Sequence, residues 1–367
     1  MPVMNKTTLP FYAKLSLNLI SVAILCALAY LGADILMPIC FAIVLAMLLL
    51  PVVNWLNRRG VPSVLAMILS LLVALLIAGG VLYFLSSQVA HFMDDLPSIK
   101  QKLNQHVSTV EKWISKEINI SRREQRSAVA SATENIQSGG SGIGTLFMGL
   151  ASTLITMVLL PIYGFLILYY RKLIHKFLLD VFSDHHRSLV EEVLTESKTI
   201  VQGYMVGLLI EMAIVTGLNA AGFFIIGIQY AFFLAVLSAV LNLIPYIGMI
   251  IATVICMAVT LTTSTNLGDI LWVGAVLIIV QFIDNNFIMP YVVSSKVRIN
   301  ALVSIIGVLI GGALAGLSGM FLSIPGLAIL KAIFDRVNEL KPWGGLLGDD
   351  LSILKTKVKR KKVKEER

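Results

Sequence analysis

Two carboxylates interrupt apolar segments that are otherwise long enough to cross a lipid bilayer. Glu211 lies at the centre of the run GYMVGLLIEMAIVTGLN, and Asp284 follows the run LWVGAVLIIVQFI. An ionisable side chain in such a segment costs roughly 2.5–3.5 kcal/mol on insertion scales and usually has a function. We therefore predict that Glu211 and Asp284 bind a proton, a cation or a polar solute. A satisfied hydrogen-bond cluster between helices is the alternative.

Amide side chains accompany the second carboxylate. At 100° per residue, Gln281, Asp284 and Asn285 share one face of a helix, whereas Asn286 points elsewhere. This pattern predicts a polar lining for a solute or cation path. We expect Pro290 to end the helix.

Two apolar segments, 230–262 and 301–334, are too long for one ordinary crossing. The first contains LIPYIG at 243–248, where Pro245 and Gly248 should open the helix just after Asn242. The second contains GGALAGLSG at 311–319, with the candidate residues Gly311, Gly312, Gly316 and Gly319. Broken helices recur at transporter binding sites, so both breaks are predicted to line a transport path. The alternatives are a simple kink at the proline and close helix packing at the glycines.

The composition of the whole chain sets the class. Its 367 residues are 57% hydrophobic and 14% charged, with a mean hydropathy of +0.87. Apolar runs long enough for a membrane helix recur, whereas a β-barrel would show short alternating segments. We predict an all-α polytopic membrane protein with eight hydrophobic segments, near 15–31, 35–53, 62–85, 146–170, 203–226, 230–262, 268–290 and 301–334. If every segment crosses the membrane once, there are eight spans. If the two overlength segments fold back as re-entrant hairpins, there are six.

Charge and periodicity divide the chain into four parts. These are N-terminal transmembrane segments (1–85), extracytoplasmic amphipathic helices with a Gly/Ser linker (86–145), a transport core with a cytoplasmic loop at 171–200 (146–340), and a basic tail (341–367). Lys and Arg beside the segment ends place both termini in the cytoplasm. Apolar residues from Val89 to Ile114 recur at steps of three and four, so this stripe must bury itself on the membrane, its own bundle or a neighbouring protomer. We therefore expect a homo-oligomer.

Other classes of function find no support in the sequence. Cys26, Cys40 and Cys256 lie in apolar runs without metal-ligand spacing, and the adjacent pair His185 and His186 would point about 100° apart on a helix. There is no phosphate-binding lysine motif and no constellation of an enzyme, and no cofactor is expected. The basic tail has no interleaved aromatic residues, so we expect it to touch anionic lipid and not nucleic acid.

The C-terminal half resembles the AI-2E family of bacterial membrane proteins, which are named for export of autoinducer-2. The resemblance rests on VQGY at 201–204, IPYIG at 244–248, Pro290, and the glycine run 311–319 followed by SIP at 323–325. It implies a bacterial inner-membrane transporter, with members linked to export of a furanosyl quorum signal or to sodium/proton antiport. Oligomeric assembly and an elevator-like movement are implied by the same analogy.

Three hypotheses of function follow. The first is a secondary transporter that exports a small polar solute, driven by a proton or sodium gradient. The second is a sodium/proton antiporter. The third is a non-transporting membrane scaffold that binds an envelope partner through residues 89–136.

Overall fold

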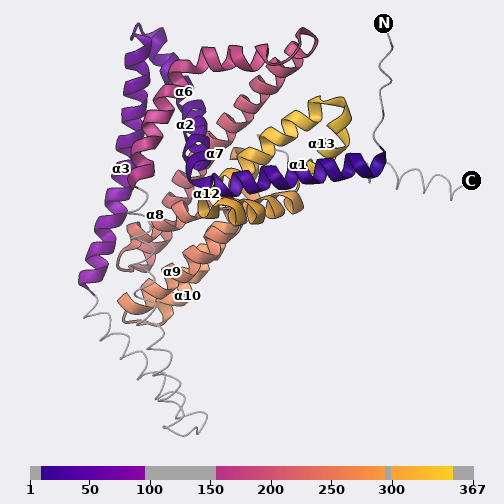
Figure 1. Ribbon diagram of the computed structural model, residues 1–367. Helices are drawn as coiled ribbons and strands as arrows, with labels where there is room; N and C mark the ends of the chain where they lie inside the picture. Colours follow the sequence, from indigo (N-terminus) through magenta and orange to yellow (C-terminus); the bar gives the residue numbers. More distant parts are fainter. Residues whose placement is uncertain (1–9, 96–153, 294–298, 350–367) are drawn as a thin grey trace, which may run out of the picture.

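The computed structural model describes residues 10–95, 154–293 and 299–349, and every regular element in these ranges is a helix (Figure 1). Within them, five helical stretches are long and apolar enough to cross a bilayer: Ala33–Arg58, Ser63–Asp94, Asp184–Ile226, Gly268–Val292 and Ala301–Arg336. Large apolar side chains are exposed along these helices, for example Leu72, Ile77 and Ile225. An apolar surface of this extent suits contact with lipid and not with water. The prediction of an all-α polytopic membrane protein is confirmed.

The N-terminal half forms a helical group with its own core. α1 (Phe11–Leu31) is followed after Gly32 by α2 (Ala33–Arg58), and then come α3 (Ser63–Asp94) and α6 (Leu154–Asp180). Figure 1 shows α2, α3 and α6 side by side, whereas α1 extends away from α3 and α6 and contacts α2 and α12. The core between the three is apolar and includes Val53, Ala66, Leu71 and Leu168.

α7 (Arg187–Ile226) is the central helix of the molecule. It has 40 residues and packs against α2, α6, α8, α10 and α12. The region 171–200, expected as a loop, is instead mostly the end of α6 and the beginning of α7, joined through the short helix η1 (Asp184–His186). The charged residues there made it look like a loop, but a helix that leaves the membrane can carry charge on every face.

The first overlength segment folds back on itself. α8 (Ala231–Asn242) ends before the LIPYIG break, and α9 (Ile247–Thr263) returns beside it, with the Cys256 thiol reaching the carbonyl oxygen of Leu234 at 3.9 Å. Gly248 makes the turn possible, because a Cβ there would lie 1.8 Å from the carbonyl oxygen of Leu241. At 1.5 Å per residue the two arms are only about 18 and 25 Å long, shorter than a bilayer core of about 30 Å.

The second overlength segment, α12 (Ala301–Arg336), is also a hairpin. The backbone leaves helical geometry at Ala315 and Gly316, and Gly316 has a positive φ of 58° that suits glycine. Across the hairpin a Cβ at Gly319 would lie 1.9 Å from the carbonyl oxygen of Gly311, so the two arms touch backbone to backbone. Both overlength segments thus fold back, as the six-crossing alternative requires.

The prediction that Pro290 ends its helix is wrong. α10 (Gly268–Ile283) continues into a π-helical turn, η2 (Asp284–Ile288), and then into α11 (Met289–Val292). The N–H of Met289 bonds to the carbonyl oxygen of Asp284, five residues back, which closes the wider turn. Pro290 therefore lies in the first turn of a new helical piece, where its missing N–H costs nothing.

The amphipathic stripe is described only where it begins. Val89 and Phe92, near the end of α3, pack against an apolar cluster formed by residues of α3 and of α7 to α10, so this part of the stripe is partly buried in the chain's own bundle. The expected second outer helix, the Gly/Ser linker, the connection with Lys296 and Arg298 and most of the basic tail lie outside the described residues. The described chain closes with η3 (Asn338–Leu340) and α13 (Lys341–Leu347), which packs on α12.

Candidate functional site

The two carboxylates singled out in the sequence meet around one amide. The Nδ2 of Asn242 lies 3.5 Å from Oε1 of Glu211 and donates a hydrogen bond of 3.2 Å to Oδ2 of Asp284. The three residues come from α7, the end of α8 and the π-helical turn η2. We call Glu211, Asn242 and Asp284 the carboxyl site.

Both carboxyl groups are withdrawn from the surface. Glu211 is 7% exposed and Asp284 is 2% exposed. Oε2 of Glu211 and Oδ1 of Asp284 are buried without a hydrogen-bond partner, and neither carboxyl pairs with a Lys, Arg or His of the described ranges. Two buried negative charges side by side are unfavourable without compensation. A proton or a cation at the carboxyl site would supply it.

Gln281 extends the site along α10. Its Nε2 lies 3.4 Å from Oδ2 of Asp284 and 3.0 Å from Oδ1 of Asn285. The predicted shared face is therefore present, but it runs from the buried Asp284 to the exposed Asn285. Asn286 points elsewhere as expected, bonding to the carbonyl oxygen of Phe282 at 2.8 Å.

A small cavity adjoins the carboxyl site between α7, α8, α9 and α10. Its volume is about 10 Å³, and its polar lining consists of Asn219, Ser238, Asn242, Thr253 and Gln281. That volume holds about one water molecule. The cavity suits a water or a small cation and is closed to an organic solute in this conformation.

Local sequence explains why these side chains reach the same place. The LIPYIG break ends α8 at Asn242, so its amide lies at the tip of the α8–α9 hairpin. The wider π-helical turn starts at Asp284, and π-bulges occur frequently at functional sites. On α7, Tyr204 lies seven residues before Glu211 and thus on the same face; it is also buried. Sequence reasoning gave Tyr204 no role in the site, although it belongs to the VQGY motif.

Two further amides on α7 join it to neighbouring helices. Nδ2 of Asn219 donates to Oγ of Ser238 at 2.9 Å and joins α7 to α8. Nε2 of Gln202 donates to the carbonyl oxygen of Met47 at 3.2 Å and joins α7 to α2. Asn219 also lines the small cavity.

The glycines of α12 lie at a different place from the carboxyl site. Gly311 and Gly319 face each other across the α12 hairpin, a Cβ at Gly312 would meet Met320, and Gly316 forms the tip. The residues that pack these arms against α7 are Val201, Tyr204, Val308 and Ile324. These contacts fit the alternative of close packing between the two arms. The break at Pro245 follows Asn242, which bonds to Asp284 of the carboxyl site. In the described ranges no group of three His, Cys, Asp or Glu residues could hold a metal ion.

Comparison with known proteins places these features in a family. The model of the AI-2E family transporter matches residues 19–339. The chain belongs to the AI-2E family. A relative in Haemophilus influenzae, named as a transport protein, is 27% identical over 340 residues, which are 91% of this chain and 95% of the relative.

Other AI-2E relatives cover similar lengths. YrrI of Bacillus subtilis is 25% identical over 82% of this chain and 85% of its own length, and YhhT of Escherichia coli is 24% identical over 90% and 93%. Both are named as transport proteins. The resemblance seen in the motifs of the C-terminal half is confirmed and extends over the N-terminal helices as well.

Proposed function

We propose that this AI-2E protein is a secondary transporter of the bacterial inner membrane that exports a small polar solute. A proton or sodium gradient drives the export, and the carboxyl site binds the coupling ion. The observation that carries the proposal is the pair of buried carboxyl groups on two helices that share the amide of Asn242 and each keep one unpartnered oxygen. The furanosyl signal associated with the family is one member of the proposed solute class.

The charge of the carboxyl site links ion binding to transport. An empty carboxyl site with both groups ionised leaves two negative charges in a segment that faces lipid and apolar side chains, which is costly. A bound proton or sodium ion removes much of this cost and so stabilises the conformation that buries the site. Ion binding then shifts the balance between conformations, as coupling requires.

The broken helix supplies the second element of the proposal. The α8–α9 hairpin ends at the carboxyl site, and its break leaves backbone groups without regular helical partners, as at binding sites of other transporters. A short hairpin can shift relative to α7 with few changes in its own hydrogen bonds. We infer that its movement opens the small cavity to a solute. The homo-oligomer expected from the outer stripe belongs to the same proposal.

The test removes one negative charge at a time. Cells that produce Glu211→Gln or Asp284→Asn should lose the export of the solute by about tenfold or more, because the amide cannot take up a proton and binds a cation poorly. Untargeted mass spectrometry of the culture medium, compared between wild-type, variant and empty-vector cells, measures the export. Membrane insertion and oligomer size of each variant are checked by detergent extraction and size-exclusion chromatography.

Matched controls make the same chemical changes elsewhere on the same helices. Glu191 on α7 and Asp269 on α10 lie far along the helix from the carboxyl site. Glu191 forms a surface pair with His175, and Asp269 lies in the first turn of α10, where it accepts hydrogen bonds from Ser264 and Asn266. Glu191→Gln and Asp269→Asn should both export like wild type. Inserted Glu211→Gln and Asp284→Asn variants that export like wild type would contradict the role of the carboxyl site.

Sodium/proton antiport is the second candidate, and the small cavity beside the carboxyl site favours it. A volume of about 10 Å³ accepts an ion and no organic solute. Purified protein in liposomes that contain a pH-sensitive dye separates the two functions. A sodium gradient that moves protons in the absence of any organic solute, with loss of this flux in Asp284→Asn, would select the antiporter.

A further inference from the structure

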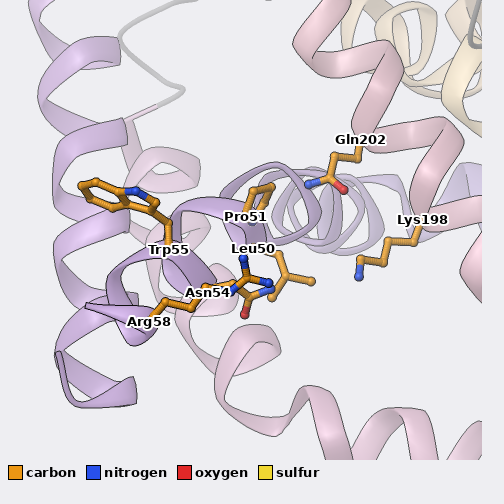
Figure 2. Close-up of a pocket in the computed structure, with 7 residues that line it drawn as sticks. All are labelled: Leu50, Pro51, Asn54, Trp55, Arg58, Lys198 and Gln202. Carbon is orange, nitrogen blue, oxygen red and sulfur yellow. The ribbon is translucent and has the colours of Figure 1, made fainter. Parts of the chain in front are cut away.

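A second pocket lies between α2 and α7, and none of the carboxyl-site residues line it. Its volume is about 280 Å³, slightly below the range of about 300–1,000 Å³ that is usual for drug-sized ligands. It is lined by Leu50, Pro51, Asn54, Trp55, Arg58, Lys198 and Gln202. Figure 2 shows Asn54 and Arg58 of α2 on one side and Lys198 and Gln202 of α7 on the other.

The lining of this pocket is that of an anion site. It contains two cations, Arg58 and Lys198, and the amide donors of Asn54 and Gln202, and no carboxylate is among its lining residues. The amide of Gln202 already bonds to the carbonyl oxygen of Met47, which leaves Arg58, Lys198 and Asn54 to face a ligand. A guanidinium and an ammonium that converge with an amide suit the oxygens of a phosphate group.

The neighbouring carboxylates do not neutralise these cations. On the first turns of α7, Glu191 pairs with His175, while Glu192 and Glu196 both pair with Arg336 of α12. Arg58 and Lys198 form no ion pair with any residue of the described ranges. Because these carboxylates pair with other residues, Arg58 and Lys198 leave a positive pocket with room for an anion.

The surroundings of the pocket indicate the membrane surface. Trp55 is half exposed, and the guanidinium of Arg59 stacks over its ring at 4.0 Å. Arg171 and Lys172 of α6 lie at the same end of the bundle, since Val53 and Leu168 share the core between α2 and α6. Trp beside Arg and Lys is typical of a membrane–water interface, and the excess of positive charge places this end in the cytoplasm, where the leaflet carries anionic lipid.

We propose that the pocket formed by Arg58, Lys198 and Asn54 binds the phosphate of an anionic phospholipid headgroup. The lipid phosphate lies between α2 and α7 and connects the N-terminal helices to the central helix. The acyl chains of the lipid run along the exposed apolar side chains of these helices. The site is independent of the carboxyl site and of the solute that the protein carries. A soluble phosphate ester shares the same chemistry, and the experiment separates the two sources.

The test counts bound lipid on the intact protein. Native mass spectrometry of detergent-purified protein, titrated with phosphatidylglycerol or phosphatidylcholine, should show retained phosphatidylglycerol on the wild type. Arg58→Gln and Lys198→Gln should each weaken this binding by about tenfold or more, because each removes a charged hydrogen-bond donor to the phosphate. Arg59→Gln is the matched control, because it removes one charge from the next residue, which stacks on Trp55 but is not itself among the residues that line the pocket.

Thermal unfolding in detergent distinguishes the two sources of phosphate. Phosphatidylglycerol should raise the unfolding temperature of the wild type and of Arg59→Gln. It should raise the unfolding temperature of the double variant Arg58→Gln/Lys198→Gln much less. Inorganic phosphate without lipid should have little effect; an equal rise with inorganic phosphate would assign the site to a soluble phosphate and overturn the lipid. Equal phosphatidylglycerol binding and stabilisation in all variants would overturn the site itself.

Discussion

At the scale of single residues, Asn242 links the candidate site. Its amide nitrogen reaches Glu211, 31 residues away in sequence, and Asp284, 42 residues away. A hydrogen bond to a charged group contributes about 1.5–3 kcal/mol, twice that of a neutral pair or more. The amide thus holds two carboxyl groups together that would otherwise repel each other, and it fixes the space in which an ion can bind.

Replacing Asn242 by alanine should therefore destabilise the protein. We expect a lower unfolding temperature in detergent and a loss of about tenfold in the flux that depends on the carboxyl site. Asn286→Ala is the matched control, because its amide bonds to a backbone carbonyl group and its side chain is exposed. Equal unfolding temperatures for the two variants would show that the Asn242 amide contributes nothing to holding the carboxyl groups.

At the scale of elements, the two hairpins are the features that distinguish this fold from a simple bundle. Each has its break where glycine allows backbones to touch: Gly248 against Leu241 in the first, and Gly319 against Gly311 in the second. Small residues at a helix contact permit such approach, because no side chain separates the two backbones. The arms of each hairpin are therefore held at a distance that any larger residue would increase.

Gly319→Ala tests this contact. Its Cβ would lie 1.9 Å from the carbonyl oxygen of Gly311, so the α12 arms must separate, and we expect a clear fall in the unfolding temperature and in the yield of folded protein. Gly326→Ala lies on the same helix with nothing within 4 Å of its Cβ, and it should be neutral or gain up to about 1 kcal/mol from the higher helix propensity of alanine. Similar behaviour of the two variants would contradict the close packing.

At the scale of the whole molecule, α7 connects the parts. It carries Glu211 at its centre, packs against the helices of both halves, and at its exposed beginning pairs through Glu192 and Glu196 with Arg336 at the end of α12. The side chains of these ion pairs are 35–55% exposed, and exposed pairs contribute only about 0–1 kcal/mol each. The apolar core therefore provides most of the stability, and the ion pairs adjust the position of the α12 hairpin on α7.

Arg336→Gln should consequently have a small effect that depends on salt. We expect a decrease in the unfolding temperature of a few degrees at about 0.01 M salt, where the screening length is about 30 Å, and little decrease at about 1 M, where it is about 3 Å. Lys341→Gln, a nearby cation outside the described ion pairs, is the control and should show no salt-dependent difference. A decrease for Arg336→Gln that is the same at both salt concentrations would indicate a packing role instead.

Sequence patterns predicted the elements well where composition alone decides them. Long apolar runs gave the membrane helices, and the Pro245 and Gly316 breaks were both found in the expected segments. The patterns failed at 171–200, where α6 and α7 continue through the charged residues, and at Pro290, where a π-helical turn carries the helix on to Val292. In both cases charged residues or a proline suggested that a helix ends, but the helix continues. Local sequence does not specify this continuation.

The sequence by itself determined the class of the protein and its family, and it drew attention to Glu211 and Asp284, because burying a carboxylate in an apolar segment is costly enough to be seen without a structure. Only the tertiary structure decided that Glu211, Asn242 and Asp284 meet, that the glycines of α12 pack on each other, and that Arg58 and Lys198 enclose a pocket. These facts depend on which helices are neighbours and at what depth. That arrangement follows from the packing of all helices around α7 and not from the spacing of residues within any one of them.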